Sequence, residues 1–442
     1  QQTNAGRYNG FEGKTLLLQN DIDLNNQSWI PIGSGVSSDV STITFRGKFN
    51  GQGHTIKNLS ITGEIAVFQV GLFGIINNSE IENLVLDTVY INCDEIADIG
   101  GFGCGSLFGW ASYSNISNIK VKNALIDMGT APVNTPMPGG LGGDVHDCTI
   151  MNSSVEDSTI TSKENSIGGI IGEVRRTSTY FSMVNCYAKN VVLRDGAFVG
   201  GLVGYLGQAD SSNQIFNIKN SYAIATFEFT DKFSTVPYVG SLIGYIADEQ
   251  EMHVENSYGV SKYSNPTSRS LRAGDIIGNN TSKKLVLNNV YYNSETSGLG
   301  KLIGYGNAAS STNVSGLGTA TMKDATGASH TLNYILNNWV KNNAGEYYSW
   351  TVLDNDYPSF GVPEVKSIKV LPVVKEVYPG ETLQLEKEIL PFGANDIEVK
   401  YKSNNPNVVV DSNGLVKISS NFTTTYVAVI TMTPLDSKYP AS

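Results

Sequence analysis

The sequence predicts an all-β protein, a right-handed parallel β-solenoid that ends in a short capping helix and is followed by a small β-sandwich. Three observations lead to this prediction. A short glycine phrase returns at a nearly constant spacing, which is typical of stacked supersecondary units. One helical pattern follows the last repeat, and the composition changes again near residue 363. The expected handedness rests on the general preference for right-handed crossovers.

The repeated phrase consists of two apolar residues between glycines, and it first occurs as Gly71-Leu72-Phe73-Gly74. The third copy departs from the pattern, because Gly142 replaces its second apolar residue. We expect the glycines to permit sharp bends or a close approach between rungs, while the apolar pair fills the interior. The seven closing glycines are 29 to 40 residues apart: Gly74, Gly109, Gly143, Gly172, Gly204, Gly244 and Gly278.

The repeats place the solenoid at residues 1–362, with the repeats themselves over about 71–306 and a capping segment over about 321–360. Before the first repeat, apolar and polar residues alternate as they do in half-buried strands. In that stretch Ile56 and Ile61 are expected to point inward, as is Leu59.

The capping segment contains the helical pattern. Its apolar residues follow the i, i+3, i+4, i+7 spacing of one helix face: Leu332, Ile335, Leu336 and Trp339. Ser329 is the expected N-cap, and Asn342-Asn343-Ala344-Gly345 is the expected stop. We expect this helix to cover the open end of the stack, because an uncovered sheet edge invites pairing with other chains.

A second phrase in the later repeats places an asparagine two residues before a tyrosine, as in Asn185-Cys186-Tyr187. Asparagines on successive rungs can form a hydrogen-bonded ladder and tolerate the left-handed conformation of tight turns. The tyrosines form a candidate ligand-binding column: Tyr187, Tyr222, Tyr258 and Tyr291. Pointing outward, they could stack on sugar rings. We favour an inward, structural role, because Leu84 and Ile119 hold the same position in earlier repeats.

Residues 363–442 form the predicted second domain. Several short alternating strands suggest a β-sandwich; they are expected at 368–370, 383–386, 397–401, 408–410 and 426–430. Tyr378-Pro379-Gly380-Glu381 and Asp411-Ser412-Asn413-Gly414 supply the turns.

Charge and cysteine content limit the possible partners. The net charge of −11 argues against nucleic acid, which requires clustered Lys and Arg. No apolar run approaches the roughly 20 residues of a membrane span, so membrane insertion is not expected. Cys93, Cys104, Cys148 and Cys186 match no zinc spacing. Cys148 and Cys186 could lie on adjoining rungs, as a disulfide or as buried thiols.

The sequence contains no recognisable catalytic phrase, so we predict no catalytic residues, no metal site, no cofactor and no enzyme activity. Asp94, Glu95 and Asp98 form the densest acidic group, which fits a calcium site or, as we favour, a solvated loop. His146 with Asp144 and Asp147 could hold a metal, but we favour a polar turn, because a metal site requires more ligands.

The repeats resemble the GLUG-motif family of bacterial surface proteins, on the glycine phrases and on the opening Asn50-Gly51-Gln52-Gly53-His54. Residues 365–442 resemble a bacterial immunoglobulin-like domain of intimin-type adhesins, on Tyr378 to Thr382, Tyr401 to Pro406 and Asp411 to Val416. Together these resemblances imply an extracellular protein at a bacterial cell surface or outer membrane, in a gut Bacteroidetes-like organism.

We therefore expect a non-catalytic adhesin-like protein that presents an extended solenoid face to a host protein or glycan. Two alternatives remain. A carbohydrate-active β-helix enzyme would need two or three carboxylates within roughly 5–10 Å of one another on one groove. A purely structural surface stalk would bind no ligand.

Overall fold

The computed structural model describes residues 9–33, 44–62, 69–92, 103–128, 137–162, 165–175, 180–207, 215–230, 236–247, 251–264, 270–353, 355–361, 367–390, 397–421 and 427–435. The chain divides into two compact units, Gln1–Ser359 and Phe360–Ser442. The first is the predicted parallel β-solenoid, and the second is built from antiparallel strands.

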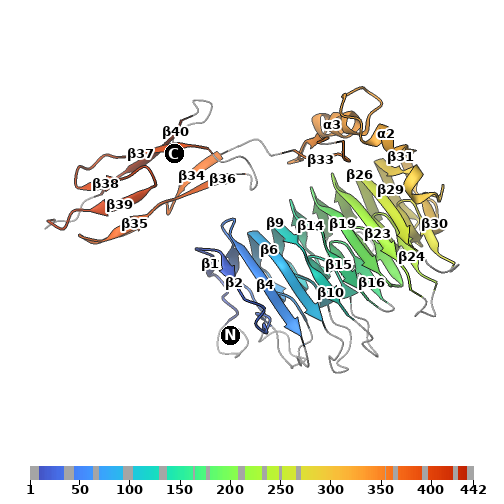
Figure 1. Cartoon of the computed structure of the whole chain (residues 1–442), viewed down its shortest axis with the longest axis horizontal. Coiled ribbons are helices and arrows are strands. Elements are labelled where there is room, and N and C mark those ends of the chain that lie inside the picture. Colours follow the sequence, from blue (N-terminus) through green and yellow to red (C-terminus); the bar gives the residue numbers. More distant parts are fainter. Residues whose placement is uncertain are drawn as a thin grey trace. The chain divides into compact units, whose positions relative to one another are not determined.

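The largest sheet of the solenoid contains seventeen described strands, paired in parallel from rung to rung. Figure 1 shows them stacked in sequence order from blue to yellow. Like residues therefore form columns, and Ile116 lies in register between Ile81 and Ile150. The bounds are β1 Thr15–Leu17, β2 Ile22–Asp23, β3 Lys48–Asn50, β4 Thr55–Thr62, β6 Glu80–Asn92, β9 Asn115–Lys122, β10 Leu125–Asp127, β13 Thr149–Met151, β14 Ser154–Glu156, β15 Thr159–Thr161, β18 Tyr180–Val184, β19 Tyr187–Arg194, β22 Ile215–Lys219, β23 Tyr222–Glu228, β26 Glu251–Ser264, β29 Lys284–Asn293 and β31 Ser310–Leu317.

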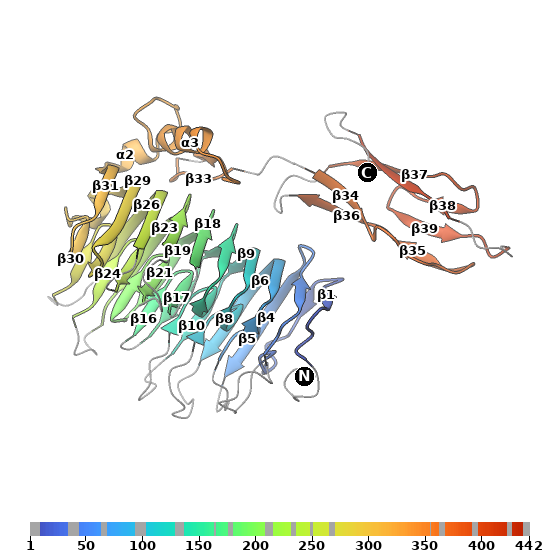
Figure 2. The ribbon, with the colours of Figure 1, turned by 180° about the vertical axis from the view of Figure 1, so that it is seen from behind.

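Smaller parallel sheets complete the rungs (Figure 2). The long one holds β5 Phe73–Asn77, β8 Phe108–Ser112, β12 Gly142–His146, β17 Ile171–Val174, β21 Val203–Leu206, β25 Ile243–Ile246, β28 Ile277–Asn280 and β30 Ile303–Gly306. The short one holds β16 Ser166–Gly168, β20 Phe198–Gly200, β24 Tyr238–Gly240 and β27 Arg272–Gly274. In the earlier rungs β7 Gly103–Cys104 pairs with β11 Met137–Pro138.

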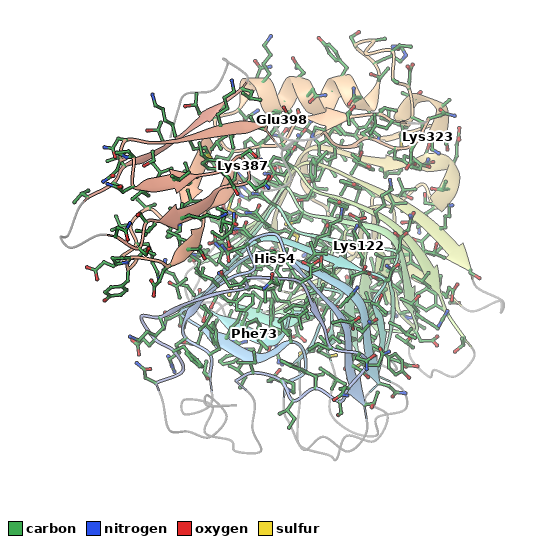
Figure 3. All side chains as sticks on the ribbon, turned by 60° about the vertical axis from the view of Figure 1, so that its left-hand side comes forward. His54, Phe73, Lys122, Lys323, Lys387 and Glu398 are labelled. Atoms are coloured by element: carbon green, nitrogen blue, oxygen red, sulfur yellow. The ribbon has the colours of Figure 1, made fainter. Side chains whose placement is uncertain are left out.

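The interior between the sheets is apolar, as the alternating pattern predicted. Ile56, Leu59 and Ile61 are buried. Phe73, labelled in Figure 3, is also buried, and its ring centroid lies 5.0 Å from that of Phe45.

The glycine phrases lie where the short and long sheets meet. A Cβ atom on Gly200 would lie 1.9 Å from the carbonyl oxygen of Val203, and one on Gly244 would lie 2.5 Å from the backbone nitrogen of Val199. Both obstacles are backbone atoms, so no side-chain movement could relieve the contact. Neither glycine has a positive φ, so close backbone approach, rather than a left-handed bend, explains the phrase.

The third copy of the phrase also forms a rung. A Cβ atom on Gly142 would lie 2.1 Å from Cζ of Phe108. The phenyl ring of the preceding rung therefore occupies the space that an apolar side chain fills in the other copies.

The predicted asparagine ladder is confirmed. The side-chain amide of Asn220 donates to Oδ1 of Asn185 at 2.8 Å, and that of Asn256 donates to Asn220 at 2.6 Å. Asn289 donates in the same way to Asn256 at 2.6 Å. These four residues have φ values from 47° to 57°, the left-handed region that asparagine tolerates.

The predicted helix is present as α3 Leu332–Asn342, and it follows the short helices α1 Ser294–Ser297 and α2 Thr319–Met322. Its N-cap is Thr331 rather than Ser329, because Oγ1 of Thr331 accepts the backbone N–H of Tyr334 at 3.3 Å. Leu332, Leu336 and Trp339 are buried.

The position of α3 differs from the expected cover of the stack's end. The helix contacts β26, and the side-chain amide of Asn256 donates to the carbonyl oxygen of Leu336 at 3.3 Å. Figures 1 and 2 both show α3 beside the ends of the later strands. Beyond the helix the chain runs along the asparagine ladder toward the later rungs, through β32 Trp350–Thr351 to β33 Ser359–Phe360. The side-chain amide of Asn185 donates to the carbonyl oxygen of Glu346 at 2.7 Å, and that of Asn220 donates to the carbonyl oxygen of Tyr348 at 3.0 Å.

Cys104, Cys148 and Cys186 are buried free thiols, and Cys93 lies outside the described residues. The register explains why Cys148 and Cys186 do not pair. Thr149, next to Cys148, lies opposite Ser182, whereas Tyr187, next to Cys186, lies opposite Ser154.

The described residues of the second unit form three small antiparallel sheets. Ile368 and Met432 form its buried centre, with Val399 and Tyr401 packed against them. The last strand begins at Ile430 rather than near residue 426, in register with Ser403. The bounds are β34 Ser367–Leu371, β35 Thr382–Gln384, β36 Glu386–Leu390, β37 Val399–Ser403, β38 Val408–Val410, β39 Leu415–Ile418 and β40 Ile430–Pro434. Within the described parts of the chain, no helix is long and apolar enough to cross a membrane.

Candidate functional site

The tyrosine column expected from the sequence is largely inaccessible. Tyr222 and Tyr258 are 1% and 0% exposed. Their rings are stacked with centroids 5.0 Å apart, and Tyr187 stacks on Tyr222 at 4.8 Å. Tyr291 is also buried, and its hydroxyl donates to Oδ1 of Asn289 at 3.0 Å.

The segment after α3 covers this column. The Trp350 ring lies 5.6 Å from Tyr222 and 5.7 Å from Tyr258, and the Tyr258 hydroxyl donates to the carbonyl oxygen of Pro358. Burial raises the pKa of Tyr222 and of Tyr258 well above the ordinary value. Tyr222 and Tyr258 join two parts of the fold and offer no ring face to a ligand, which agrees with the inward, structural role favoured from the sequence and not with the alternative of a binding column.

The possible metal residues are not assembled into a metal site. Asp147 uses Oδ1 to accept the backbone N–H of Tyr180 at 3.2 Å, whereas Asp144 contacts His146 at 3.2 Å and Arg175 at 2.7 Å. No group of three His, Cys, Asp or Glu side chains that could hold a metal occurs in the described portion of the chain. Asp94, Glu95 and Asp98 lie outside it.

A different row of side chains brings charged and aromatic groups together along the long sheet. It consists of the residues that directly follow the seven closing glycines and Gly304 of β30, in register along the long sheet, and we call it the post-glycine row. Its members are Ile75, Trp110, Asp144, Glu173, Tyr205, Tyr245, Asn279 and Tyr305.

Two carboxylates occupy the middle of the row. Asp144 and Glu173 are in-register neighbours on β12 and β17, whose backbones are about 4.8 Å apart in such a sheet. Arg175 bridges them, with Nη2 at 2.7 Å from Asp144 and Nε at 3.3 Å from Glu173. Their side chains are only 5% and 10% exposed. Oδ1 of Asp144 has no hydrogen-bond partner among the described residues.

The environment separates the titration of the two carboxyl groups. Burial raises the pKa of Glu173 to about 7, and the negative charge of Asp144 adds to the effect while Arg175 opposes it. Burial also opposes ionisation of Asp144, but His146 and Arg175 outweigh it, so the pKa of Asp144 is lowered. Near neutral pH one carboxyl is ionised and the other is close to half-protonated.

Aromatic side chains gather at the later end of the row. Tyr205 and Tyr245 lie on the long sheet with ring centroids 5.2 Å apart. Phe198 and Tyr238, from the short sheet, reach the same place, with Phe198 at 4.8 Å and Tyr238 at 5.7 Å from Tyr245. Tyr305 completes this aromatic group at 6.2 Å from Tyr238 and is 57% exposed.

An arginine lies at the edge of the aromatic group. The guanidinium carbon of Arg272 is 5.0 Å from the ring centroid of Tyr238 and 4.9 Å from that of Tyr305. Nη1 of Arg272 donates to the Tyr238 hydroxyl. Ala197, Phe198, Val236, Tyr238 and Arg272 line a pocket of about 320 Å³ beside these rings. This combination of ring faces, a fixed cation and a hollow is suited to binding a small polar ring.

The sequence carried a signal for this group that the expected tyrosine column did not use. A tyrosine follows the closing glycine at Tyr205, Tyr245 and Tyr305, and an aromatic residue stands two positions before the opening glycine at Phe198 and Tyr238. What the sequence could not show is that the glycines bring the two sheets close enough for these rings to meet.

Comparisons with known proteins agree with part of this architecture. Residues 364–425 match the family model of the bacterial Ig-like domain (group 2). This part of the chain is thus an immunoglobulin-like domain, as expected. No curated protein matches the chain.

Two solved structures show a distant likeness. A Bacteroides ovatus protein described as a candidate immunoglobulin A1 protease is 18% identical, with a TM-score of 0.40, and the match covers 79% of this chain and 86% of that one. A structure named IgA1 Protease is 15% identical, with a TM-score of 0.34, and the match covers 68% of this chain and 19% of that one. The prediction that this chain is not an enzyme is contradicted by these names and is not kept. At such identities and TM-scores the likeness assigns no catalytic residue here.

Proposed function

We propose that the chain is an adhesin-like protein of the bacterial cell surface that binds a host glycan through the aromatic group of its solenoid. One observation carries the proposal. Five aromatic rings from two sheets meet at a partly exposed place, beside a pocket of about 320 Å³. Tyrosine rings combine a flat apolar face with a hydroxyl, which suits the apolar face and polar rim of a sugar ring.

The rest of the chain is consistent with display outside the cell. The resemblance of the repeats to GLUG-motif surface proteins and the immunoglobulin-like domain favour an extracellular location. A net charge of −11 keeps such a protein soluble through self-repulsion. The ligand would contact several rungs, because the row of side chains continues along the stack.

Binding of the purified chain to an array of host glycans and matrix proteins tests the proposal. The double variant Tyr245→Ala and Tyr305→Ala is expected to bind about tenfold more weakly or worse, because two stacking faces are removed. Tyr90→Ala is the matched control, since Tyr90 is an exposed tyrosine on β6 of the largest sheet. Absence of binding by the wild-type chain would favour a structural stalk instead.

The carboxylate pair favours a second candidate, a carbohydrate-active enzyme. Asp144 and Glu173 are neighbours with pKa values moved in opposite directions, as an acid and base pair requires. In hydrolysis, Glu173 would give its proton to the glycosidic oxygen as the bond to the anomeric carbon breaks. At the short separation of this pair, Asp144 would bond to that carbon as the leaving sugar departs, and water, giving a proton to Glu173, would then displace Asp144.

This second candidate is tested by the release of reducing ends from soluble polysaccharides. Wild-type protein is expected to release them, and Glu173→Gln, which cannot supply the proton, is expected to lose at least a hundredfold in rate. Equal rates for the two proteins, or no release by either, would exclude the assignment of Glu173 as the acid.

A further inference from the structure

We propose that the pocket beside Arg272 binds a carboxylated sugar ring, so that the glycan recognised by the aromatic group carries an acidic unit. This inference rests on the proposed function and specifies its ligand. The pocket is lined by Phe198, Tyr238 and Arg272 together with two small apolar residues, Ala197 and Val236. Its volume of about 320 Å³ is at the lower end of small-molecule sites, which suits a single ring.

The charge of Arg272 is the first argument. Arg175 and Arg194 both form ion pairs with carboxylates, and Arg46 donates to Oδ1 of Asn77. Arg272 forms no ion pair within the described ranges and is solvent-exposed, although the chain as a whole is acidic. Its guanidinium group is exposed, so an anionic group from outside the protein can reach it.

The position of the guanidinium group is the second argument. Two tyrosine rings, at 5.0 and 4.9 Å, hold it at the edge of the pocket, and the Tyr238 hydroxyl accepts from Nη1. These contacts fix the plane of the fork while using few of its five N–H donors. A held guanidinium binds a carboxylate with two parallel hydrogen bonds at a smaller entropic cost than a mobile one.

The surrounding rings supply the third argument. Tyr305 is 57% exposed and contacts both Tyr238 and the guanidinium group. A pyranose ring stacked on an aromatic face here would have a carboxylate on its ring carbon within reach of Arg272. A neutral sugar would use the rings but leave the cation without an anionic partner, so the site discriminates in favour of the acid.

Calorimetry of the full chain with defined oligosaccharides tests the inference. The first pair of probes is an oligogalacturonate and its methyl ester, which differ in charge and by one methyl group per ring. The second pair is sialyllactose and lactose, which differ by a terminal acidic sugar and so distinguish such a sugar from internal uronates. Binding of either acidic probe at least tenfold more tightly than its neutral counterpart is the expected result.

Substitutions assign that preference to Arg272. Arg272→Gln is expected to weaken acidic binding about 10- to 100-fold, the loss of one charge-assisted interaction, with little effect on the neutral probe. Arg272→Lys keeps the positive charge but lacks the paired N–H donors of a guanidinium group. Its affinity for the acidic probes is therefore expected to lie between those of wild type and Arg272→Gln. Lys122→Gln, which removes a positive charge from β9 (Figure 3), is the matched control and should bind as wild type does.

The possible failures are distinguishable. Equal binding of acidic and neutral probes, unchanged in Arg272→Gln, would overturn the inference while leaving glycan recognition by the aromatic group intact. No binding of any of the four probes would overturn the inference, while binding to other glycans on the array would still support the proposed function.

Discussion

Asp144 and Glu173 share the guanidinium group of Arg175, yet their pKa values move in opposite directions from the ordinary ones. Asp144 has the shorter contact with Arg175 and also contacts His146. Glu173 has the longer contact with Arg175 and a hydrogen bond from Oγ of Ser166 at 3.3 Å. One cation cannot fully stabilise two buried negative charges, so the less well supported carboxyl retains its proton to higher pH.

The first prediction concerns the pH dependence of stability. The pKa of Glu173 rises from 4.5 to about 7 on folding, so between these values the folded chain binds more protons than the unfolded chain. Its burial penalty is absent below pH 4.5 and fully present above pH 7, so this group lowers stability as the pH rises through that window, by about 3 kcal/mol. Urea unfolding at half-unit steps from pH 4.5 to 8 measures the effect.

Glu173→Gln is expected to remove the pH-dependent contribution of Glu173 to the free energy of unfolding. The difference in stability between this variant and wild type should therefore change as the pH rises from 4.5 to about 7. Asp144 acts in the opposite sense: its lowered pKa stabilises the fold above pH 3.8, and that stability is lost only at lower pH. The two contributions therefore occur in separate ranges. Parallel pH curves for wild type and Glu173→Gln would show that Glu173 is not the titrating group.

A second prediction concerns the asparagine ladder at Asn220. Its amide donates to Asn185 and to the carbonyl oxygen of Tyr348, and its Oδ1 accepts from Asn256 and from Nε1 of Trp350 at 2.8 Å. Asn220→Ala removes all four bonds and also places an alanine at a φ of 48°. We expect a loss of about 3–5 kcal/mol in the free energy of unfolding.

Asn220→Gly separates the two causes, because glycine adopts a positive φ without strain. It should be less destabilised than Asn220→Ala by about 1 kcal/mol, and the remainder is the cost of the lost hydrogen bonds. Chemical denaturation of both variants provides the comparison. If both retained wild-type stability, the ladder would have no energetic role.

Much of the solenoid follows from local pattern. The spacing of the glycine phrases gives one rung per repeat, and alternation places Ile56 and Leu59 inside. Asparagine at one position in successive repeats predicts the ladder, because stacked rungs bring identical side chains into register. These features depend only on a residue and its counterpart one repeat away, so a single sequence reveals them.

The features that the sequence did not reveal depend on longer-range contacts. Tyr222 is buried by Trp350, which follows it by more than a hundred residues, and alternation cannot anticipate such a cover. The aromatic group likewise requires Phe198 of the short sheet to meet Tyr245 of the next rung of the long sheet. Similarly, the N-cap of α3 is Thr331 rather than Ser329, because the Thr331 hydroxyl accepts the backbone N–H of Tyr334.

A third prediction concerns the glycine phrase. In Gly200→Ala the new methyl group would lie 1.9 Å from the carbonyl oxygen of Val203, so the short and long sheets must separate. We expect a loss of more than about 3 kcal/mol or a failure to fold. Gly318→Ala is the control, because its nearest neighbour is the flexible carboxylate of Glu295 at 2.9 Å. Soluble yield and the thermal unfolding temperature are measured for both variants. Equal values for Gly200→Ala and Gly318→Ala would contradict the explanation that the glycine phrase is required by close backbone approach.

The last prediction concerns the cover over the tyrosine column. Trp350→Ala removes a buried ring that contacts Tyr222 and Tyr258 and the donor that binds Oδ1 of Asn220. We expect destabilisation of about 3–5 kcal/mol, as for other buried aromatic truncations. Water should also reach the Tyr222 hydroxyl, whose pKa is now raised well above the ordinary value by burial. Spectrophotometric titration at high pH should then show additional tyrosine ionising near its ordinary pKa in the folded variant.

Trp29→Ala is the control, since Trp29 lies in the early rungs and donates through Nε1 to the carbonyl oxygen of Leu72 at 3.0 Å. It removes an indole without uncovering the column, so its tyrosine titration should match wild type. An unchanged titration in Trp350→Ala would mean that the sheet itself, rather than the returning segment, shields these tyrosines.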